Sequence, residues 1–211
     1  SVIILPHGKT VLIDTGGLFN NNYSLAKDKI IPYLNSKGIN RIDVLILTHG
    51  DYDHMGESVN LINNIRVSKV ILNCGNFNNL ENKLIKALEN KKIKYYSCID
   101  NLNIDKYKFQ FLNTSLYDNE NDNSSVIYFN YKNLKFLFMA DASIKRENDI
   151  LDMYDLNYID FLKVGHHGSN TSSSKRFIDS INPKYSLISV GENNRYGHPK
   201  EAVLDILKDS K

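Results

Sequence analysis

A dense cluster of metal-binding side chains lies in the run THGDYDH, residues 48–54. Two imidazoles and two carboxylates fall within six positions, at His49, Asp51, Asp53 and His54. Adjacent carboxylates repel each other unless a cation or a proton lies between them. Imidazole and carboxylate groups at this density suit a divalent transition metal. The cluster therefore predicts a metal site rather than a set of loop caps.

Further ligating side chains follow two other apolar runs that are predicted to be strands. Asp141 comes after the run 134–139, and His166 and His167 come after the run 160–164. Open α/β sheets place their sites outside the carboxyl ends of their strands, so we expect six of these seven side chains at one sheet edge. A single ion in an open catalytic site rarely takes more than about four protein ligands, which favours two metals. Asp141 taken alone would be interpreted as a loop cap.

Three residues near these runs each allow a structural and a functional interpretation. Asp14 precedes the run TGG, so it can cap a turn, or it can orient the metal loop by accepting a hydrogen bond from a ligand. His167 can contact phosphate or assist the leaving oxygen, or it can be a buried structural histidine. His198 lies between a glycine and a proline, where it can act as leaving-group acid or phosphate contact, or cap its loop.

Polar side chains follow the second of the paired histidines and precede a predicted helix. Ser169, Asn170, Thr171 and Ser172 offer hydroxyl and amide donors for phosphate oxygens at a helix N-terminus. One of them can equally be the helix N-cap. We predict substrate binding for these four residues and for Asn194.

The elements that must position these residues alternate between β-rich runs and helical patterns, which is typical of a layered α/β fold. Strands are expected at 2–5, 10–13, 43–47, 69–72, 93–96, 109–112, 125–130, 134–139, 160–164 and 185–190. Helices are expected at 24–37, 57–65, 80–90, 144–154, 175–181 and 200–208. Pro32 is expected to kink or delay the first helix. Residues 6–9 and 131–133 are predicted hairpin turns, and 18–23 a polar loop.

Length and composition are those of one globular domain. The chain has 211 residues, of which 42% are hydrophobic, enough for a full core. No apolar run approaches the roughly 18 residues that span a membrane. The chain opens in the middle of a strand without a signal sequence, so we expect a domain cut from a larger protein. The net charge of +2 provides no broad face for nucleic acid, so any phosphate binding must be local.

The two cysteines, Cys74 and Cys98, form no CxxC pair. The preferred interpretation is two inert, partly buried thiols. A disulfide between them is the alternative if the domain is exported, because disulfides persist in oxidising compartments.

The chemistry-bearing runs together resemble the successive motifs of the metallo-β-lactamase superfamily. The matching motifs are Asp14-Thr-Gly, His49-x-Asp51-x-Asp53-His54, Asp141 at a strand end, and Gly165-His166. More closely, the runs 47–56, 136–141, 163–169 and 193–199 resemble the C-terminal domain of ComEC-type DNA-internalisation competence proteins. This second resemblance extends over nearly the whole chain.

The resemblance implies a four-layer αββα sandwich, with two mixed sheets flanked by helices and a dinuclear site at one edge. It implies a nuclease or phosphodiesterase that acts on single-stranded DNA during its uptake. It also implies a tethered, extracytoplasmic domain, with a membrane-channel domain of the same polypeptide as partner. In that family a further strand precedes the position of Ser1, so we expect the first strand to be missing. We expect a monomer.

The chain departs from the superfamily pattern in two places. Asp51 replaces the middle histidine of the second motif, and no histidine lies between His54 and Asp141 to serve as the third motif. Asn123 and Ser125 stand at the corresponding position and are expected to support the ligands.

The resemblance then divides the ligands between two metals. The first site would have His49, Asp51 and a bridging Asp141, and the second would have Asp53, His54, Asp141 and His166. The first site is rich in oxygen, so we expect it to be weakly held and to prefer Mn²⁺ or Mg²⁺ over Zn²⁺.

The implied mechanism is attack on a phosphodiester by a metal-bridged hydroxide that Asp53 orients. Two alternatives remain open. The same site can hydrolyse a small-molecule ester, thioester or lactam. Without its third-motif histidine, the domain can also be a degenerate module that binds DNA or a partner without turnover.

Overall fold

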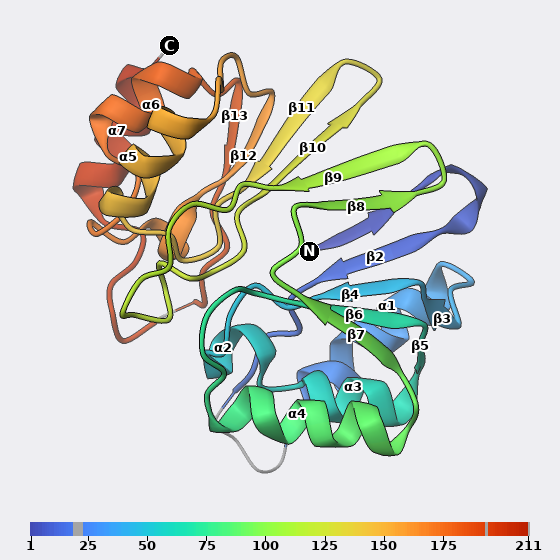
Figure 1. Ribbon diagram of the computed structural model, residues 1–211. Coiled ribbons are helices and arrows are strands. Elements are labelled where there is room, and N and C mark those ends of the chain that lie inside the picture. The colour runs from blue at the N-terminus through green and yellow to red at the C-terminus, as the bar shows by residue number, and fades with distance from the viewer. Residues whose placement is uncertain (19–22, 193, 211) are drawn as a thin grey trace. The chain divides into compact units, whose positions relative to one another are not determined.

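The computed structural model describes residues 1–18, 23–192 and 194–210 (Figure 1). It contains two compact units, unit 1 at Ser1–Ile99 and unit 2 at Asp100–Lys211. Most of the predicted polar loop 18–23 lies outside the described residues, as does Asn193 of the fourth quoted run. Each unit has a mixed sheet with helices packed against it, which confirms the predicted α/β class.

Unit 1 is built on a five-stranded sheet with the order β1-β2-β4-β6-β7. Its strands are β1 (Val2–Ile4), β2 (Thr10–Ile13), β4 (Val44–Ile46), β6 (Lys69–Leu72) and β7 (Lys94–Ser97). β1 and β2 form the predicted antiparallel hairpin, and the other neighbours are parallel. A separate ladder pairs β3 (Arg41–Ile42) with β5 (Arg66–Val67). Because β2 and β4 are parallel, the residues that follow their carboxyl ends lie side by side.

The helices of unit 1 bury their apolar faces against this sheet. They are a π-helical turn at Ala26–Ile30, α1 (Ile31–Ser36), α2 (Tyr52–Met55), α3 (Ser58–Asn64) and α4 (Asn79–Asn90). The first predicted helix is divided into this π-helical turn and α1, and Pro32 lies in the first turn of α1, directly after the π-helical turn. Leu61 of α3 and Leu84 of α4 pack with Leu45 of the sheet in the core. Asn78 and Glu81 form a capping box that begins α4.

Unit 2 is built on a six-stranded sheet with the order β13-β12-β11-β10-β9-β8. Its strands are β8 (Asn101–Ile104), β9 (Tyr107–Phe111), β10 (Ile127–Tyr131), β11 (Leu134–Phe138), β12 (Phe161–Lys163) and β13 (Tyr185–Leu187). β11, β12 and β13 are parallel, and the remaining pairs are antiparallel. A row of stacked rings crosses the sheet through Phe136, Phe161 and Tyr185, with centroid separations of 4.8 and 5.2 Å.

The helices of unit 2 gather on one side of its sheet (Figure 1). They are α5 (Ile144–Met153), α6 (Lys175–Ile181) and α7 (Glu201–Asp209). Ile150 of α5 and Phe177 of α6 are fully buried in one apolar cluster with Leu137 of β11 and Leu162 of β12. This packing fixes the loops that leave the carboxyl ends of β11 and β12.

The disulfide state differs from the preferred interpretation of the sequence. Cys74 and Cys98 are joined by a disulfide, with their Cα atoms 4.3 Å apart, so the interpretation as two inert thiols was wrong. The two cysteines follow the ends of β6 and β7, which pair in parallel through Leu72 and Ser97. The register brings them together although they are 24 positions apart in the sequence.

No helix of the described residues is both long enough and apolar enough to cross a membrane.

Candidate metal centre

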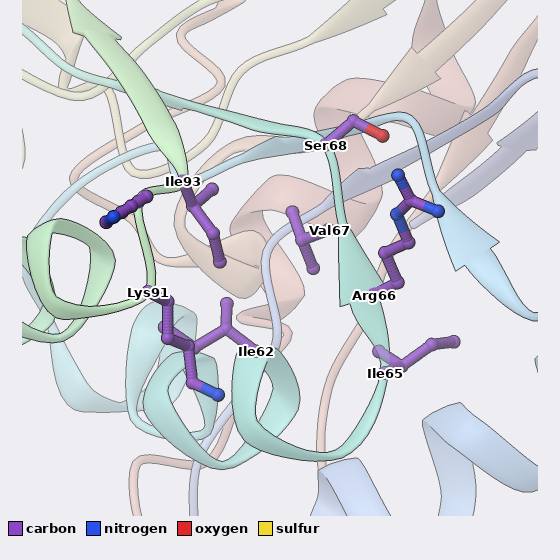
Figure 2. Close-up of a pocket in the computed structure, with 8 residues that line it drawn as sticks. Ile62, Ile65, Arg66, Val67, Ser68, Lys91 and Ile93 are labelled. Atoms are coloured by element: carbon purple, nitrogen blue, oxygen red, sulfur yellow. The ribbon is translucent and has the colours of Figure 1, made fainter.

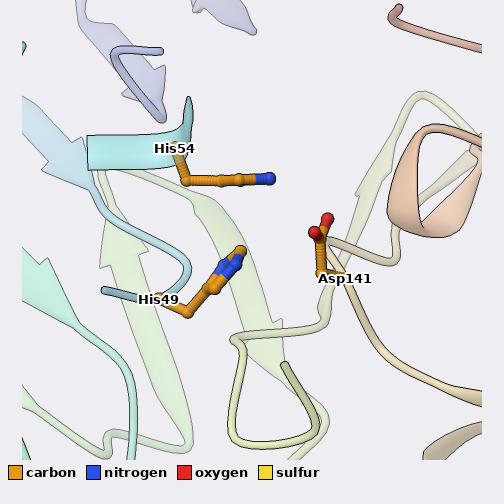
Figure 3. Close-up of side chains that lie close together, drawn as sticks. All are labelled: His49, His54 and Asp141. Carbon is orange, nitrogen blue, oxygen red and sulfur yellow. The ribbon is translucent and has the colours of Figure 1, made fainter. Parts of the chain in front are cut away.

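The predicted ligand cluster of unit 1 lies between the end of β4 and the beginning of α3. His49 is fully buried in the loop after β4, and Asp51 is the N-cap residue of α2. Asp53 and His54 lie within α2, a short helix that the sequence did not predict. Figure 3 shows His49 and His54 extending from these two segments, and their ring centroids are 4.2 Å apart. The cluster is therefore a preformed group of side chains rather than a flexible loop.

Asp14 and Thr48 support the two histidines from behind. Asp14 Oδ1 accepts the backbone N–H of Thr48 at 2.8 Å, and Asp14 Oδ2 accepts the Thr48 hydroxyl at 2.9 Å. Asp14 Oδ2 also lies 2.9 Å from His54 Nδ1, and Thr48 Oγ1 lies 3.1 Å from His49 Nδ1. When one ring nitrogen of a histidine is hydrogen-bonded to a carboxylate or a hydroxyl group, the other ring nitrogen is directed toward a metal. Asp14 therefore orients the ligands, and Thr48 is a supporting residue that the sequence did not single out.

The pKa of Asp14 agrees with this role. Burial alone would raise the pKa of its carboxyl group, but His54, the Thr48 amide and His49 together lower it below its usual value. Asp14 is therefore a carboxylate, which can hold His54 with Nδ1 protonated.

The donor set fits a divalent metal. His49 Nε2 lies 3.6 Å from Asp51 Oδ2, a separation that two donors about 2.1 Å from a shared ion can adopt. Both donor types, imidazole nitrogen and carboxylate oxygen, bind zinc, and oxygen donors also suit manganese. Asp51 and Asp53 are within two positions of each other, so a cation between them would relieve their repulsion.

Position 50 in the cluster is a glycine because the segment at the start of α4 approaches it closely. A Cβ atom at Gly50 would lie 2.1 Å from the amide nitrogen of Asn78 and 2.8 Å from Glu81 Oε2. Asn78 donates its side-chain N–H to the Gly50 carbonyl at 2.9 Å while it caps α4. The ligand loop is thus anchored to the start of α4.

Unit 2 holds a second set of predicted ligands, Asp141 and His166. Asp141 is buried in the turn after β11, as Figure 3 shows, and His166 lies in the turn Gly165–Gly168 after β12. The parallel register joins the two turns, because the His166 N–H donates to the Ala140 carbonyl at 2.8 Å. His166 Nε2 lies 3.7 Å from Asp141 Oδ2, which again suits two donors to one ion. This pair shows that the ends of neighbouring parallel strands bring these two residues together, whereas His49 and His54 follow β4, a strand of the other sheet.

The polar run after His167 mainly supports the His166 turn. Thr171 Oγ1 lies 3.1 Å from His166 Nδ1, and the Ser172 hydroxyl donates to the Gly165 carbonyl at 2.9 Å. Ser169 Oγ lies 3.0 Å from Thr171 Oγ1, whereas Asn170 is exposed. The helix N-cap is Ser174, so the suggestion that one of residues 169–172 caps α6 was wrong. Substrate contact by these four residues stays a prediction.

His167 and His198 lie on two loops that meet within unit 2. His167 Nδ1 lies 2.7 Å from the Ser189 carbonyl, so this ring is bound to the chain and Nδ1 carries its proton. The His198 ring has its centroid 6.1 Å from that of His166. The Asn194 side chain braces the loop of His198. It accepts the backbone N–H of His198 at 2.9 Å and donates to the His198 carbonyl at 2.8 Å.

The bracing distinguishes the roles of Asn194 and His198. Asn194, expected to bind substrate, uses its amide group to close the loop. His198 Nδ1 is buried and has no hydrogen-bond partner among the described residues, whereas the Asn194 side chain closes the loop. Burial, then Lys200, His166 and His167, lower the pKa of His198.

Asn123 and Ser125, which stand in place of the third-motif histidine, lie in the segment before β10. The Asn123 amide accepts the Tyr117 N–H at 2.9 Å and donates to the Tyr117 carbonyl at 2.7 Å. Ser125 is buried, and the neighbouring Ser124 has a buried hydroxyl without a partner among the described residues. Asn123 therefore closes its own loop, and support of the ligands by either residue stays a prediction.

Glu147 of α5 fixes the far end of the polar run, a contact that no sequence pattern indicated. Its carboxylate accepts the backbone N–H groups of Ser173 and Ser174. The same run holds His166 through Thr171. Burial raises the pKa of Glu147 to about 7, although the Ser174 and Ser173 donors oppose that rise.

The raised pKa makes stability depend on pH. A carboxyl group with a folded pKa of about 7, against 4.5 unfolded, stabilises the fold below pH 4.5 and loses that contribution as the pH rises through 7. Relative to Glu147→Gln, the wild-type chain should lose up to about 3 kcal/mol of unfolding free energy between pH 4.5 and pH 8. Urea denaturation at both pH values measures this difference. The matched control is Glu201→Gln in the first turn of α7. If the unfolding free energies of the wild type and Glu147→Gln differed by the same amount at both pH values, the prediction would be contradicted.

A pocket of about 490 Å³ in unit 1 is separate from the ligand cluster (Figure 2). It is lined by Ile62, Ile65, Arg66, Val67, Ser68, Lys91, Lys92 and Ile93. α3 and α4 both end here, and cations at helix C-termini offset the negative end of the helix dipole. The lysines therefore have a structural explanation, and the pocket lies before β6 and β7 rather than after a strand that carries ligands.

Comparison with known proteins places these observations in a family context. The sequence pattern of the metallo-beta-lactamase superfamily matches residues 1–192. The chain is 33% identical to ComE operon protein 3 of Bacillus subtilis (strain 168) over 219 residues, 96% of this chain and 28% of that protein. It is 31% identical to competence protein ComA of Neisseria gonorrhoeae over 208 residues, 96% of this chain and 27% of that protein. The chain thus spans little more than a quarter of these relatives.

A solved structure shows the same fold at low identity. The metallo-beta-lactamase fold protein YhfI from Bacillus subtilis matches with a TM-score of 0.57 and 11% identity, covering 96% of this chain and 80% of that one.

Proposed function

Because the chain belongs to the metallo-beta-lactamase superfamily, we propose that it is a metal-dependent phosphodiesterase that cleaves single-stranded DNA. The observation that carries the proposal is the preformed donor set. His49 and Asp51 in unit 1, and the Asp141–His166 pair in unit 2, have spacings that two donors to one ion can adopt, and Asp14 supports His54 by a hydrogen bond.

The ligands of both units would form one dinuclear centre. His49, Asp51 and Asp141 would hold the first ion, and Asp53, His54, Asp141 and His166 the second. The support for this arrangement is the order of motifs that the chain shares with its family. Asp141 would take part because it is buried and its partner His166 lies at the end of the neighbouring strand.

The chain's own residues would prepare the reaction. Two bound divalent ions would supply an acidified water and would polarise the phosphoryl oxygen. Asp53 would accept a hydrogen bond from the attacking water and so orient it. His198 would serve the leaving oxygen, because its ring lies beside His166 and its loop is braced without it. The hydrogen bond between His167 Nδ1 and the Ser189 carbonyl would hold the His167 ring in one orientation.

The first site would prefer manganese. Its only nitrogen donor is His49, and Asp51 supplies oxygen where the family pattern has a histidine. Asn123 does not substitute for the third histidine, because both ends of its amide group bind Tyr117. Hard, oxygen-rich sites favour Mn²⁺ or Mg²⁺ over Zn²⁺. Two tightly held zinc ions in the purified chain, measured by elemental analysis, would contradict this preference.

The choice of DNA as substrate is supported by the relatives. Two of them are named as competence proteins or as a product of the comE operon, and they align over 96% of the chain. The disulfide Cys74–Cys98 supports an extracytoplasmic location, because disulfides are rare in reducing compartments. The domain would then be tethered to a larger polypeptide, act as a monomer and meet the DNA outside the cytoplasm.

A substrate panel tests the proposal. The chain is incubated with single-stranded DNA, with the phosphodiester chromogen bis(p-nitrophenyl) phosphate and with a chromogenic lactam, each with Mn²⁺ or Zn²⁺. We expect Mn²⁺-dependent cleavage of DNA and chromogen and an intact lactam. Lactam hydrolysis without DNA cleavage would replace the proposal with a small-molecule hydrolase. Metal binding without any turnover would favour a binding module.

A further inference from the structure

The loop 194–200 is fixed beside the candidate metal ligand His166. The Lys200 N–H donates to the Gly168 carbonyl at 2.9 Å, and Pro199 packs on Gly168 so closely that a Cβ there would lie 2.7 Å from Pro199 Cβ. Only glycine fits this contact, and its φ of +79° also favours glycine. The loop is therefore held against the turn that carries His166 and His167.

This loop carries two cations, the exposed Arg195 and the half-buried Lys200. The Arg195 guanidinium lies over the Tyr196 ring at 4.8 Å and donates to the Tyr196 hydroxyl at 2.5 Å. Lys200 Nζ donates to the Tyr196 carbonyl at 2.7 Å. Neither cation forms an ion pair with a carboxylate among the described residues. A guanidinium has five N–H donors, so stacking leaves Arg195 able to bind an anion.

The stack continues to His198. The Tyr196 ring lies 5.8 Å from the His198 ring at an interplanar angle of 17°, and His198 is next to His166. Arg195, Tyr196, His198 and His166 thus follow one another from solvent to the candidate metal ligand.

We infer that Arg195 and Lys200 form a binding subsite for the phosphates that flank the cleaved one in single-stranded DNA. The inference deepens the proposed function and rests on it for the position of the cleaved phosphate. With a net charge of only +2, the chain gains affinity for a polyanion from a local pair of unneutralised cations. A single isolated phosphodiester cannot use these contacts, so the subsite selects for a chain of phosphates.

A binding measurement tests the subsite without any turnover. The metal-free chain in EDTA is titrated against a fluorescein-labelled oligothymidylate over a series of NaCl concentrations. The variants Arg195→Gln and Lys200→Gln are compared with Lys132→Gln, an exposed lysine in the turn between β10 and β11. Each subsite variant should reduce the slope of log K against log salt by about 0.7, and the double variant by about 1.4. The Lys132→Gln control should keep the wild-type slope.

Substitution by another cation separates charge from stacking. Arg195→Lys should restore the salt slope, because it retains the charge. The ratio of kcat/KM for DNA to kcat/KM for bis(p-nitrophenyl) phosphate should fall in both glutamine variants. Unchanged slopes in folded Arg195→Gln and Lys200→Gln chains, or an equal loss in Lys132→Gln, would overturn the inference. If no metal supports cleavage, the proposed function fails, but the salt slopes still decide whether the subsite exists.

Discussion

Replacing Asp53 with asparagine should reduce metal-dependent DNA cleavage by roughly 10³-fold while the chain stays folded. Asp53 lies on the first turn of α2 with an exposed side chain, so the substitution should change stability by no more than about 0.5 kcal/mol. The loss would have two causes. The amide is a weaker metal ligand than the carboxylate, and it cannot accept the proton or orient the attacking water in the same way.

The matched control is Asp105→Asn in the turn between β8 and β9. Asp105 is exposed, and asparagine tolerates its φ of +52°. The activity of the Asp105→Asn chain should therefore match that of the wild type. Initial rates with Mn²⁺, together with melting temperatures, distinguish lost chemistry from lost folding. Cleavage that survives in a folded Asp53→Asn chain would contradict the proposed mechanism.

The sequence predicted that Asp141 and His166 would lie together, because strand ends have a simple geometry. Once Asp141 and His166 were recognised after apolar runs, the parallel pairing of β11 and β12 was enough to bring them to one edge. The same reasoning brings Asp14 beside Thr48, since β2 and β4 are parallel neighbours. Apolar periodicity and strand order therefore carry most of the information about the site.

The features that the sequence missed depend on contacts between distant segments. The helix α2 is only one turn long, so it has no apolar periodicity that could reveal it. β8 alternates polar and buried residues, and its run NLNI is too short and polar to stand out. Glu147 binds the backbone N–H groups of Ser173 and Ser174. Such groups do not depend on the side chain, so the residue types of these partners do not indicate the contact.

The disulfide was missed for a similar reason. The spacing of Cys74 and Cys98 says nothing until the parallel register of β6 and β7 is known. Removing both sulfurs with the variant Cys74→Ser/Cys98→Ser should lower the unfolding free energy by about 3.5 kcal/mol, the loop-closure entropy for a loop of this length. That loss is a large fraction of the roughly 5–15 kcal/mol that stabilises a typical domain.

The disulfide also bears on the ligand cluster of unit 1. Cys74 lies shortly before Asn78, whose side chain holds the Gly50 carbonyl between His49 and Asp51. Breaking the disulfide frees one end of this segment, so the oxidised chain should bind Mn²⁺ more tightly than the reduced chain. Urea denaturation and Mn²⁺ titration with and without dithiothreitol measure both effects. The double serine variant is the control, because the reductant should change neither its stability nor its metal affinity. If dithiothreitol did not change the unfolding midpoint of the wild-type chain, the Cys74–Cys98 bond would not stabilise the fold.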